Sequence, residues 1–442
     1  MAYSYFCAAK SETFMRAANE GGFFKKSNPN ANNFIHMHQS TNGSATITKK
    51  AREDRFQHHD YYLMDELLSE EHLLAREAVR AWVKAEVSPI IEEYSERADC
   101  PTHLFKGLAE IGAFGPSLPA EYGCGGMDEI AYGIIMQELE RGDSGVRSMA
   151  SVQGSLVMYP IFKFGSEEQK RHYLPKLASG ELIGCFGLTE PDHGSNPSGM
   201  ISNVKDDGDA YILNGAKMWI TNSPLADIAV VWAKNEVDKI IGMIVEKGMK
   251  GFSAPEIHGK WSLRASITGE LIFEDVRVPK KNVLPNVQGL KGPLSCLSKA
   301  RYGIAWGAIG AALDCYDTAL RYSQERIQFG KPIGAFQLTQ KKLAEMITEI
   351  TKAQLLTWRL GTLANEGRAT PAQISMAKRN NVHTALTIAR EARQILGGMG
   401  ITNEYPIMRH AMNLETVLTY EGTHDIHLLI TGMDVTGFNA FS

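Results

Sequence analysis

The spacing of apolar residues changes twice along this chain, and these changes limit the fold more than any other feature. Up to about residue 175, apolar side chains recur every three or four positions, which predicts helices. Short apolar runs then predict buried strands at 227–232, 240–245 and 271–276. From about 295 the helical spacing returns and persists. The expected order is therefore helices, strands, helices.

Two local patterns refine this outline. The run Tyr211 to Leu213, the pair Asn214-Gly215 and the run from Ala216 to Ile220 predict a hairpin with a primed turn. Long helical stripes after 295, one of them ended by Gly397-Gly398, favour an up-down bundle of four helices.

The expected fold class is α+β, and 442 residues suffice for several domains. We expect a disordered extension over 1–55, a helical domain over 56–180, a β-barrel-like domain over 181–290 and a helical bundle over 291–442.

Charge and cysteine content exclude several classes of partner. The net charge is -4 and no basic block exists, so we expect no binding to nucleic acid or to an anionic membrane. Apolar stretches are too short to span a bilayer. Six scattered cysteines without a C-x-x-C pair favour free thiols in a reducing compartment over disulfides or a zinc framework.

The first 55 residues are polar and lack regular periodicity. They make a poor transit peptide, which favours a bacterial cytoplasm over a mitochondrial matrix. The pairs His36/His38 and His58/His59 lack a third ligand at suitable spacing, so we expect solvated histidines and no metal site.

The segment most indicative of chemistry is Tyr420-Glu421-Gly422. A glycine permits close approach of a ligand, and an aromatic neighbour excludes water from the carboxylate, which raises its pKa and makes it a usable base near neutral pH. The alternative is a helix end with a solvated glutamate.

Three further segments offer ligand contacts. The run from Phe186 to Ser195 is rich in small and hydroxyl residues, and Trp219 with Thr221 could wall a flat heteroaromatic ring. Arg326 stands between two predicted helices, and its planar guanidinium group suits the binding of a pyrophosphate. The alternatives are a surface loop, a core tryptophan and a helix-end arginine.

In their order and spacing these segments resemble the acyl-CoA dehydrogenase family, over about residues 60–440. The motifs are Leu188-Thr-Glu-Pro, Trp219-Ile-Thr-Asn, Arg326-x-Gln-Phe-Gly, Leu396-Gly-Gly-x-Gly and Tyr420-Glu-Gly-Thr. The resemblance implies a homotetramer with FAD between the domains and at a subunit contact, an acyl-CoA substrate and an electron-transferring flavoprotein as acceptor.

The resemblance also implies site residues, with Glu421 as the base. The residues expected to hold FAD are Phe186, Leu188, Thr189, Gly194, Ser195, Trp219, Ile220, Thr221, Arg326, Phe329, Gln337, Gln394, Leu396, Gly397, Gly398 and Thr423. Of these, Arg326, Gln337 and the residues from Gln394 to Gly398 would come from a neighbouring subunit.

Within the family the chain resembles the branch that oxidises and decarboxylates glutaryl-CoA. The matching runs are Glu140 to Ser151, Ala300 to Trp306 and Thr419 to His427. The residues expected to contact substrate are Glu140, Arg147, Ser148, Ser151, Ser195, Arg301, Tyr420 and Gly422.

A dicarboxylyl substrate has a distal carboxylate that must be paired when buried, and Arg147 with Ser151 one turn on suits it. Without the resemblance, a helix-surface arginine beside Asp143 is the favoured interpretation.

Three other functions stay open from the sequence: a short-chain acyl-CoA oxidase, a dehydrogenase of a monocarboxylyl acyl-CoA, and a non-catalytic flavoprotein scaffold. Oxygen access to the flavin decides the first and the role of Arg147 decides the second. The presence of Glu421 and the lack of a basic patch disfavour the third.

Overall fold

The computed structural model describes residue 56 and residues 59–441, which fall within one compact unit. The expectations for 1–55 and for His36, His38 and His58 lie outside the described residues. His59 is described, and its Nδ1 lies 3.2 Å from the hydroxyl of Tyr316. Among the described helices, none has the length and apolar character that crossing a bilayer requires.

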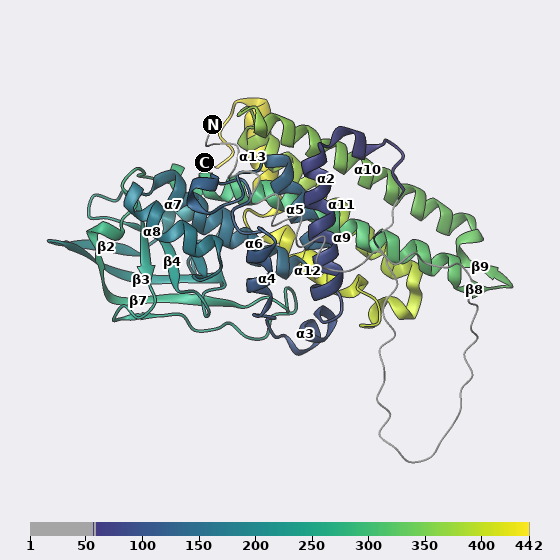
Figure 1. The fold of residues 1–442 in the computed structure, drawn as a ribbon, viewed down its shortest axis with the longest axis horizontal. Helices are drawn as coiled ribbons and strands as arrows, with labels where there is room; N and C mark the ends of the chain where they lie inside the picture. Colours follow the sequence, from purple (N-terminus) through teal and green to yellow (C-terminus); the bar gives the residue numbers. More distant parts are fainter. Residues whose placement is uncertain (1–55, 57–58, 442) are drawn as a thin grey trace, which may run out of the picture. The chain divides into compact units, whose positions relative to one another are not determined.

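The first part of the described chain is helical (Figure 1). Its helices are α2 (Glu70–Trp82), α3 (Ile91–Arg97), α4 (Leu104–Glu110), α5 (Glu129–Gly142), α6 (Ser144–Ser151), α7 (Tyr159–Phe164) and α8 (Glu167–Ala178). Ser69 begins α2 as a capping box with His72. A π-helical segment, Val152–Met158, continues α6 into α7.

A seven-stranded sheet follows. Its strands are β1 (Gly184–Gly187), β2 (Asn203–Asp207), β3 (Ala210–Thr221), β4 (Ile228–Lys234), β5 (Ile240–Glu246), β6 (Phe252–Ser253) and β7 (Thr268–Pro279). The order is β1-β4-β2-β3-β7-β6, with β5 antiparallel to β4. Strands β4 and β5 are buried over most of their length, as their continuous apolar runs predict.

The hairpin expected at Asn214-Gly215 is wrong. Strand β3 runs through this pair, and the turn lies earlier, between β2 and β3 at Gly208. Asn214-Gly215 instead coincides with a shift of register against β7, where the Asn214 amide bonds to Asp275. An Asn-Gly pair suits a bulge as well as a primed turn, because both require unusual backbone angles.

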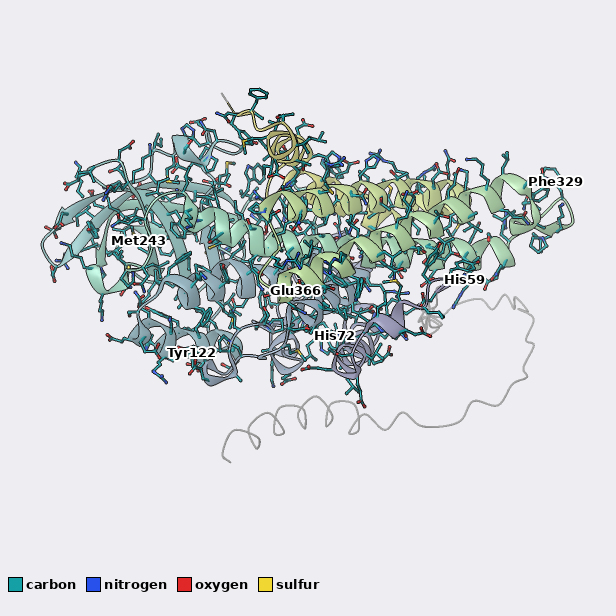
Figure 2. The ribbon with its side chains drawn as sticks, turned by 90° about the horizontal axis from the view of Figure 1, so that it is seen from above. His59, His72, Tyr122, Met243, Phe329 and Glu366 are labelled. Carbon is teal, nitrogen blue, oxygen red and sulfur yellow. The ribbon has the colours of Figure 1, made fainter. Side chains whose placement is uncertain are left out.

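The last part is a helical bundle, drawn as the long helices in Figure 2. Its helices are α9 (Lys291–Glu325), α10 (Gln337–Asn365), α11 (Pro371–Leu396), α12 (Ile407–Thr419) and α13 (His424–Thr436). The short strands β8 (Ile327–Gln328) and β9 (Lys331–Pro332) join α9 to α10. Gly397 ends α11 at a φ of 59°. The expected α+β class, with helices, sheet and helices in this order, is confirmed.

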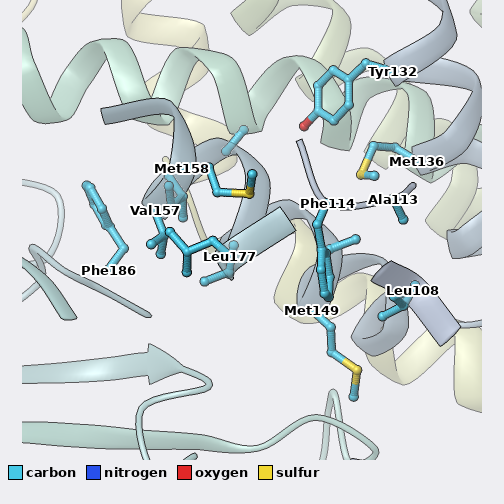
Figure 3. Packing of buried hydrophobic residues seen from close by; sticks show 14 of the residues in the cluster. Leu108, Ala113, Phe114, Tyr132, Met136, Met149, Val157, Met158, Leu177 and Phe186 are labelled. Atoms are coloured by element: carbon cyan, nitrogen blue, oxygen red, sulfur yellow. The ribbon is translucent and has the colours of Figure 1, made fainter. Parts of the chain in front are cut away.

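One buried cluster ties the first helices to the sheet and to α9. It includes Met136 of α5, Met149 of α6, Met158 after it and Phe186 of β1 (Figure 3). Flexible methionine side chains suit the irregular gaps between packed elements. This packing fixes α6, and α6 positions the side chains described next.

Candidate active site

The turn after α12 holds Glu421 in a strained conformation. Helix α12 ends at Thr419, and Glu421 has a φ of 52°, in the left-handed region that non-glycine residues rarely adopt. The side chain is half-buried, and its Oε2 atom is fully buried with no hydrogen-bond partner among the described residues. An orphaned carboxylate oxygen of this kind is available to a ligand.

Buried polar side chains from α5 and α6 meet this turn. Arg147 is 1% exposed; its Nε donates to Oε2 of Glu140 at 2.7 Å, and its Nη2 donates to the hydroxyl of Tyr420. The Ser148 hydroxyl lies 3.3 Å from the same Tyr420 oxygen. The interpretation of Arg147 as a surface arginine beside Asp143 is therefore wrong, because its partners are Glu140 and Tyr420.

A glycine on α9 makes room for this ion pair. A Cβ atom at Gly307 would lie 2.1 Å from Oε2 of Glu140 and 3.3 Å from Nε of Arg147. One turn on from Arg147, Ser151 is buried and its Oγ has no hydrogen-bond partner among the described residues. An arginine and a free hydroxyl thus line one side of α6.

Burial dominates the electrostatics of the turn. It raises the pKa of Glu421 to about 7, against the charges of Arg147, Arg301 and Lys378. For Arg147, burial lowers the pKa, but Glu140 and Tyr420 outweigh it and the net shift is upward, so this guanidinium stays charged. The site therefore combines a fixed cation with a carboxyl group that titrates near neutral pH.

The residues expected to hold a flavin ring lie at one end of the sheet. Phe186 and Leu188 are buried at the end of β1, and the Thr189 carbonyl accepts from the Met218 amide at 2.9 Å, which brings this segment beside the end of β3. Ile220 is buried and Thr221 half-buried there, whereas Gly194 and Ser195 lie in an exposed loop.

Trp219 is 57% exposed at the end of β3, with a φ of 63°. An indole of this size normally buries most of its surface, so its exposure marks a face for a ligand ring. The exposed indole of Trp219 offers a flat apolar face, so the residues at this end of the sheet suit a flat heteroaromatic group.

A second set of expected cofactor residues lies elsewhere. Arg326 directly follows α9, and Phe329 lies between β8 and β9, 94% exposed at the tip of the bundle in Figure 2. Gln337 begins α10, and Gln394 near the end of α11 accepts from Lys342 of α10. Leu396, Gly397 and Gly398 end α11, and Thr423 caps α13 by accepting from Ile426.

The length of α9 separates Arg326 from Glu421, whereas Thr423 lies two residues after Glu421. Arg301 of α9 donates to the Glu421 carbonyl at 2.6 Å, and Glu325, the last residue of α9, is 24 positions further along the helix, roughly 36 Å at the helical rise. Arg326, which directly follows Glu325, therefore lies far from Glu421 within one chain.

Three family models match the chain in this same order. They are the acyl-CoA dehydrogenase N-terminal domain over residues 69–181, the middle domain over 185–276 and the C-terminal domain over 287–436. The chain belongs to the acyl-CoA dehydrogenase family.

Relatives within the family differ in their named substrates. The chain is 35% identical over 393 residues to short-chain specific acyl-CoA dehydrogenase of Rattus norvegicus, covering 88% of this chain and 95% of the relative. It is 35% identical over 386 residues to glutaryl-CoA dehydrogenase of Desulfococcus multivorans, covering 85% and 98%. A solved glutaryl-CoA dehydrogenase from Mycobacterium smegmatis, in complex with FADH2, is 50% identical, with a TM-score of 0.84 over 86% of this chain and 97% of that one.

Sequence motifs missed two buried lysines of this dehydrogenase. Lys217 of β3 pairs with Glu190 at 2.8 Å, and Glu190 also accepts from the amides of Ile201 and Ser202, which ties the exposed loop to the sheet. Lys378 of α11 donates to backbone carbonyls of the Glu421 turn. Lys217 stands in the largely apolar run from Ala216 to Ile220, which was an available signal, but the partners of both lysines are not visible in the sequence.

Proposed function

We propose that this chain is an FAD-dependent dehydrogenase that oxidises glutaryl-CoA and releases CO2, forming crotonyl-CoA. The observation that supports this substrate is the buried Arg147, held by Glu140 and Tyr420 next to the half-buried Glu421. A charged guanidinium beside a candidate base suits an acyl chain that ends in a carboxylate.

FAD is the cofactor, and Trp219, Thr221 and the segment around Leu188 would hold its ring. When bound, FAD supplies an acceptor for the hydride that leaves the substrate β-carbon. The Arg326, Gln337 and Gln394 set would hold the far end of FAD from a neighbouring subunit, because α9 separates it from Glu421 within one chain.

Glu421 would remove the α-proton of the thioester. A carboxyl group with a pKa of about 7 is largely ionised at slightly alkaline pH, yet it is a stronger base than a solvated glutamate. The buried Oε2 has no competing hydrogen bond among the described residues, so its lone pairs are available to the substrate.

The backbone N–H of Glu421 is the candidate donor to the thioester carbonyl as negative charge develops there. Within the described part of the chain, this N–H donates no backbone hydrogen bond. A fixed donor that needs no reorganisation is the largest single source of stabilisation for an enolate-like transition state.

Arg147 would bind the distal carboxylate. Its two hydrogen bonds in the described structure use Nε and Nη2, which leaves Nη1 for the ligand, with the Ser151 hydroxyl one turn away. The pairing offsets the cost of burying a carboxylate, which would otherwise exclude glutaryl-CoA from this pocket.

Oxidation of glutaryl-CoA gives glutaconyl-CoA, whose carboxylate is vinylogous to the thioester. Cleavage of the bond to the carboxylate releases CO2 and leaves its electron pair in a conjugated dienolate. Glu421, protonated by the first step, returns its proton to that dienolate, which gives crotonyl-CoA and regenerates the base.

The experiment is anaerobic turnover of glutaryl-CoA by the flavoprotein with an artificial one-electron acceptor, with products identified by mass. Crotonyl-CoA and CO2 support the proposal. Glutaconyl-CoA alone supports oxidation but contradicts decarboxylation. Bleaching of the flavin by butyryl-CoA and not by glutaryl-CoA contradicts the substrate.

The second candidate is a dehydrogenase of a short monocarboxylyl acyl-CoA. The identity of 35% to the short-chain enzyme of Rattus norvegicus equals that to the Desulfococcus multivorans enzyme, and this favours keeping it. Replacing Arg147 separates the two candidates, because only glutaryl-CoA needs a distal cation.

We further propose a homotetramer that passes electrons to an electron-transferring flavoprotein in a reducing compartment. Five cysteines of the described part are free, which suits bacterial cytoplasm or mitochondrial matrix.

A further inference from the structure

Two buried cations bind the backbone of the turn that contains Glu421. Lys378 of α11 is 1% exposed, and its Nζ donates to the carbonyls of Tyr420 at 3.1 Å and Gly422 at 2.9 Å. Arg301 of α9 donates to the carbonyl between them, that of Glu421 itself. Three successive carbonyls thus each accept from a cation.

This arrangement explains how the turn keeps a strained conformation. A non-glycine residue in the left-handed region is strained and persists only where surrounding contacts determine it. Lys378 bridges the residues on both sides of Glu421, so it restrains the backbone angles on which the direction of the carboxylate depends.

The charge of Lys378 has no carboxylate hydrogen-bonded to it within the described residues. Burial of an ammonium without such a partner is costly, and an apolar residue would fill the space at lower cost. The carboxylate whose field most favours that charge is Glu421 itself. In return for the cost of burying it, the Lys378 charge favours ionisation of the Glu421 carboxyl group.

We propose that Lys378 is a positioning residue of the dehydrogenation: it holds the Tyr420–Gly422 turn so that Glu421 faces the substrate, and its charge favours the ionised, proton-accepting form of Glu421. This inference rests on the proposed role of Glu421 as the base.

Burial lowers the pKa of Lys378 to about 7 and raises that of Glu421 to about 7, while each charge favours the other. Other groups act on the same pair from each neighbouring helix: Glu140 of α5, Arg147 of α6, Arg301 of α9, and His424 and His427 of α13. Burial lowers the pKa of His427 to about 3, so this ring is neutral across the working range.

The test compares Lys378→Gln, Lys378→Met and Lys378→Arg in the flavoprotein. The pH at which Glu421 ionises is read from the infrared band of its protonated carboxyl group, identified by its loss in Glu421→Gln. We expect the midpoint to rise by about one pH unit in Lys378→Gln and Lys378→Met, and to return toward the native value in Lys378→Arg.

Kinetics provide the second readout. The acidic limb of kcat/KM should move with the infrared midpoint, and kcat should fall about tenfold or more with a smaller change in KM, because misplacing the base affects the chemical step. Arg390→Met is the matched control: it removes an exposed cation of α11 that bonds to Glu415 of α12 and does not contact the turn.

An unchanged infrared midpoint and an unchanged kcat in folded Lys378→Gln would overturn the proposal. If Lys378→Met does not fold, the glutamine and arginine variants decide. The infrared midpoint needs no turnover, so a native protein that oxidises no acyl-CoA would refute the proposed function while the effect of Lys378 on Glu421 is still measured.

Discussion

Glu421 lies where burial and charge oppose each other. Burial favours the protonated carboxyl group, and Arg147, Arg301 and Lys378 favour the ionised one. The result is a pKa of about 7 for a residue whose usual value is 4.5. Activity should therefore depend on pH in the neutral range.

The direction of this dependence follows from the base form being the active one. Below about pH 7, kcat/KM should fall about tenfold per pH unit. Above about pH 7, Glu421→Gln should lose a factor of 10² to 10⁴, roughly the contribution of a general base, and this factor should shrink at lower pH as native Glu421 is protonated. A profile that is flat between pH 5 and 8 would contradict Glu421 as a base with a raised pKa.

Arg147 is the residue that should set the choice of substrate. Arg147→Gln removes the charge and should lower kcat/KM for glutaryl-CoA by a factor of about 30 or more, the equivalent of roughly 2 kcal/mol for a buried charged pair. Butyryl-CoA has no distal carboxylate, so its turnover should change little. Equal losses with both substrates would favour a structural role for Arg147.

For single residues, the sequence identifies the side chains of the site better than it identifies the residues that they contact. Glu421 and Arg147 stand in motifs, so both were found. Pairing of Arg147 with Glu140 joins two helices across the break at Asp143, and simple helical spacing predicted Asp143 instead. Lys378 binds backbone carbonyls 42 and 44 residues away, and no spacing rule predicts such a contact.

Helix α9 approaches α5 and α6 closely because it carries a glycine at that point. Gly307→Ala should displace Glu140 and Arg147, lower stability by about 1–3 kcal/mol and weaken glutaryl-CoA binding. Urea unfolding and substrate titration would measure both effects. Gly432→Ala in α13 is the control, since its Cβ would meet no atom within 4 Å, and it should be neutral or slightly stabilising.

Helix α12 is anchored by one buried arginine. Arg409 donates to Glu92 of α3 at 3.0 Å and to Asp143, between α5 and α6, at 2.7 Å. Arg409→Leu leaves buried carboxylates without this partner and should cost about 3–5 kcal/mol. Thermal unfolding of the variant measures this cost.

The control is Arg390→Leu on the exposed pair with Glu415, which should cost less than about 1 kcal/mol. An Arg409→Leu variant as stable as this control would show that the buried network contributes no stability.

Element types followed from helical periodicity where one face is buried, as in α11, and from a continuous apolar run where a strand is buried throughout, as in β4. Two features escaped it. Asn214-Gly215 suits both a turn and a bulge, and only pairing with β7 decides between them. The π-helical segment Val152–Met158 has no distinct period, although it connects α6 to the core against β1.

At the scale of the whole molecule, the order of helices, sheet and helices was predictable because the spacing of apolar residues changes at each boundary. The relation between the two sets of cofactor residues was not, because it depends on the length of α9 and, in the proposed homotetramer, on contacts between subunits. Arg326→Ala tests that relation: the variant should keep its unfolding temperature without FAD but retain less FAD after gel filtration. Unchanged FAD retention would contradict a role for this set in cofactor binding.

Glutaryl-CoA as the substrate is tested most directly by anaerobic turnover with the native flavoprotein and with Arg147→Gln at matched flavin content. The product is identified by its mass. We predict crotonyl-CoA and CO2 from the native protein and little of either from the variant, with butyryl-CoA oxidised comparably by both. If the native protein oxidises butyryl-CoA and forms no product from glutaryl-CoA, glutaryl-CoA is not its substrate.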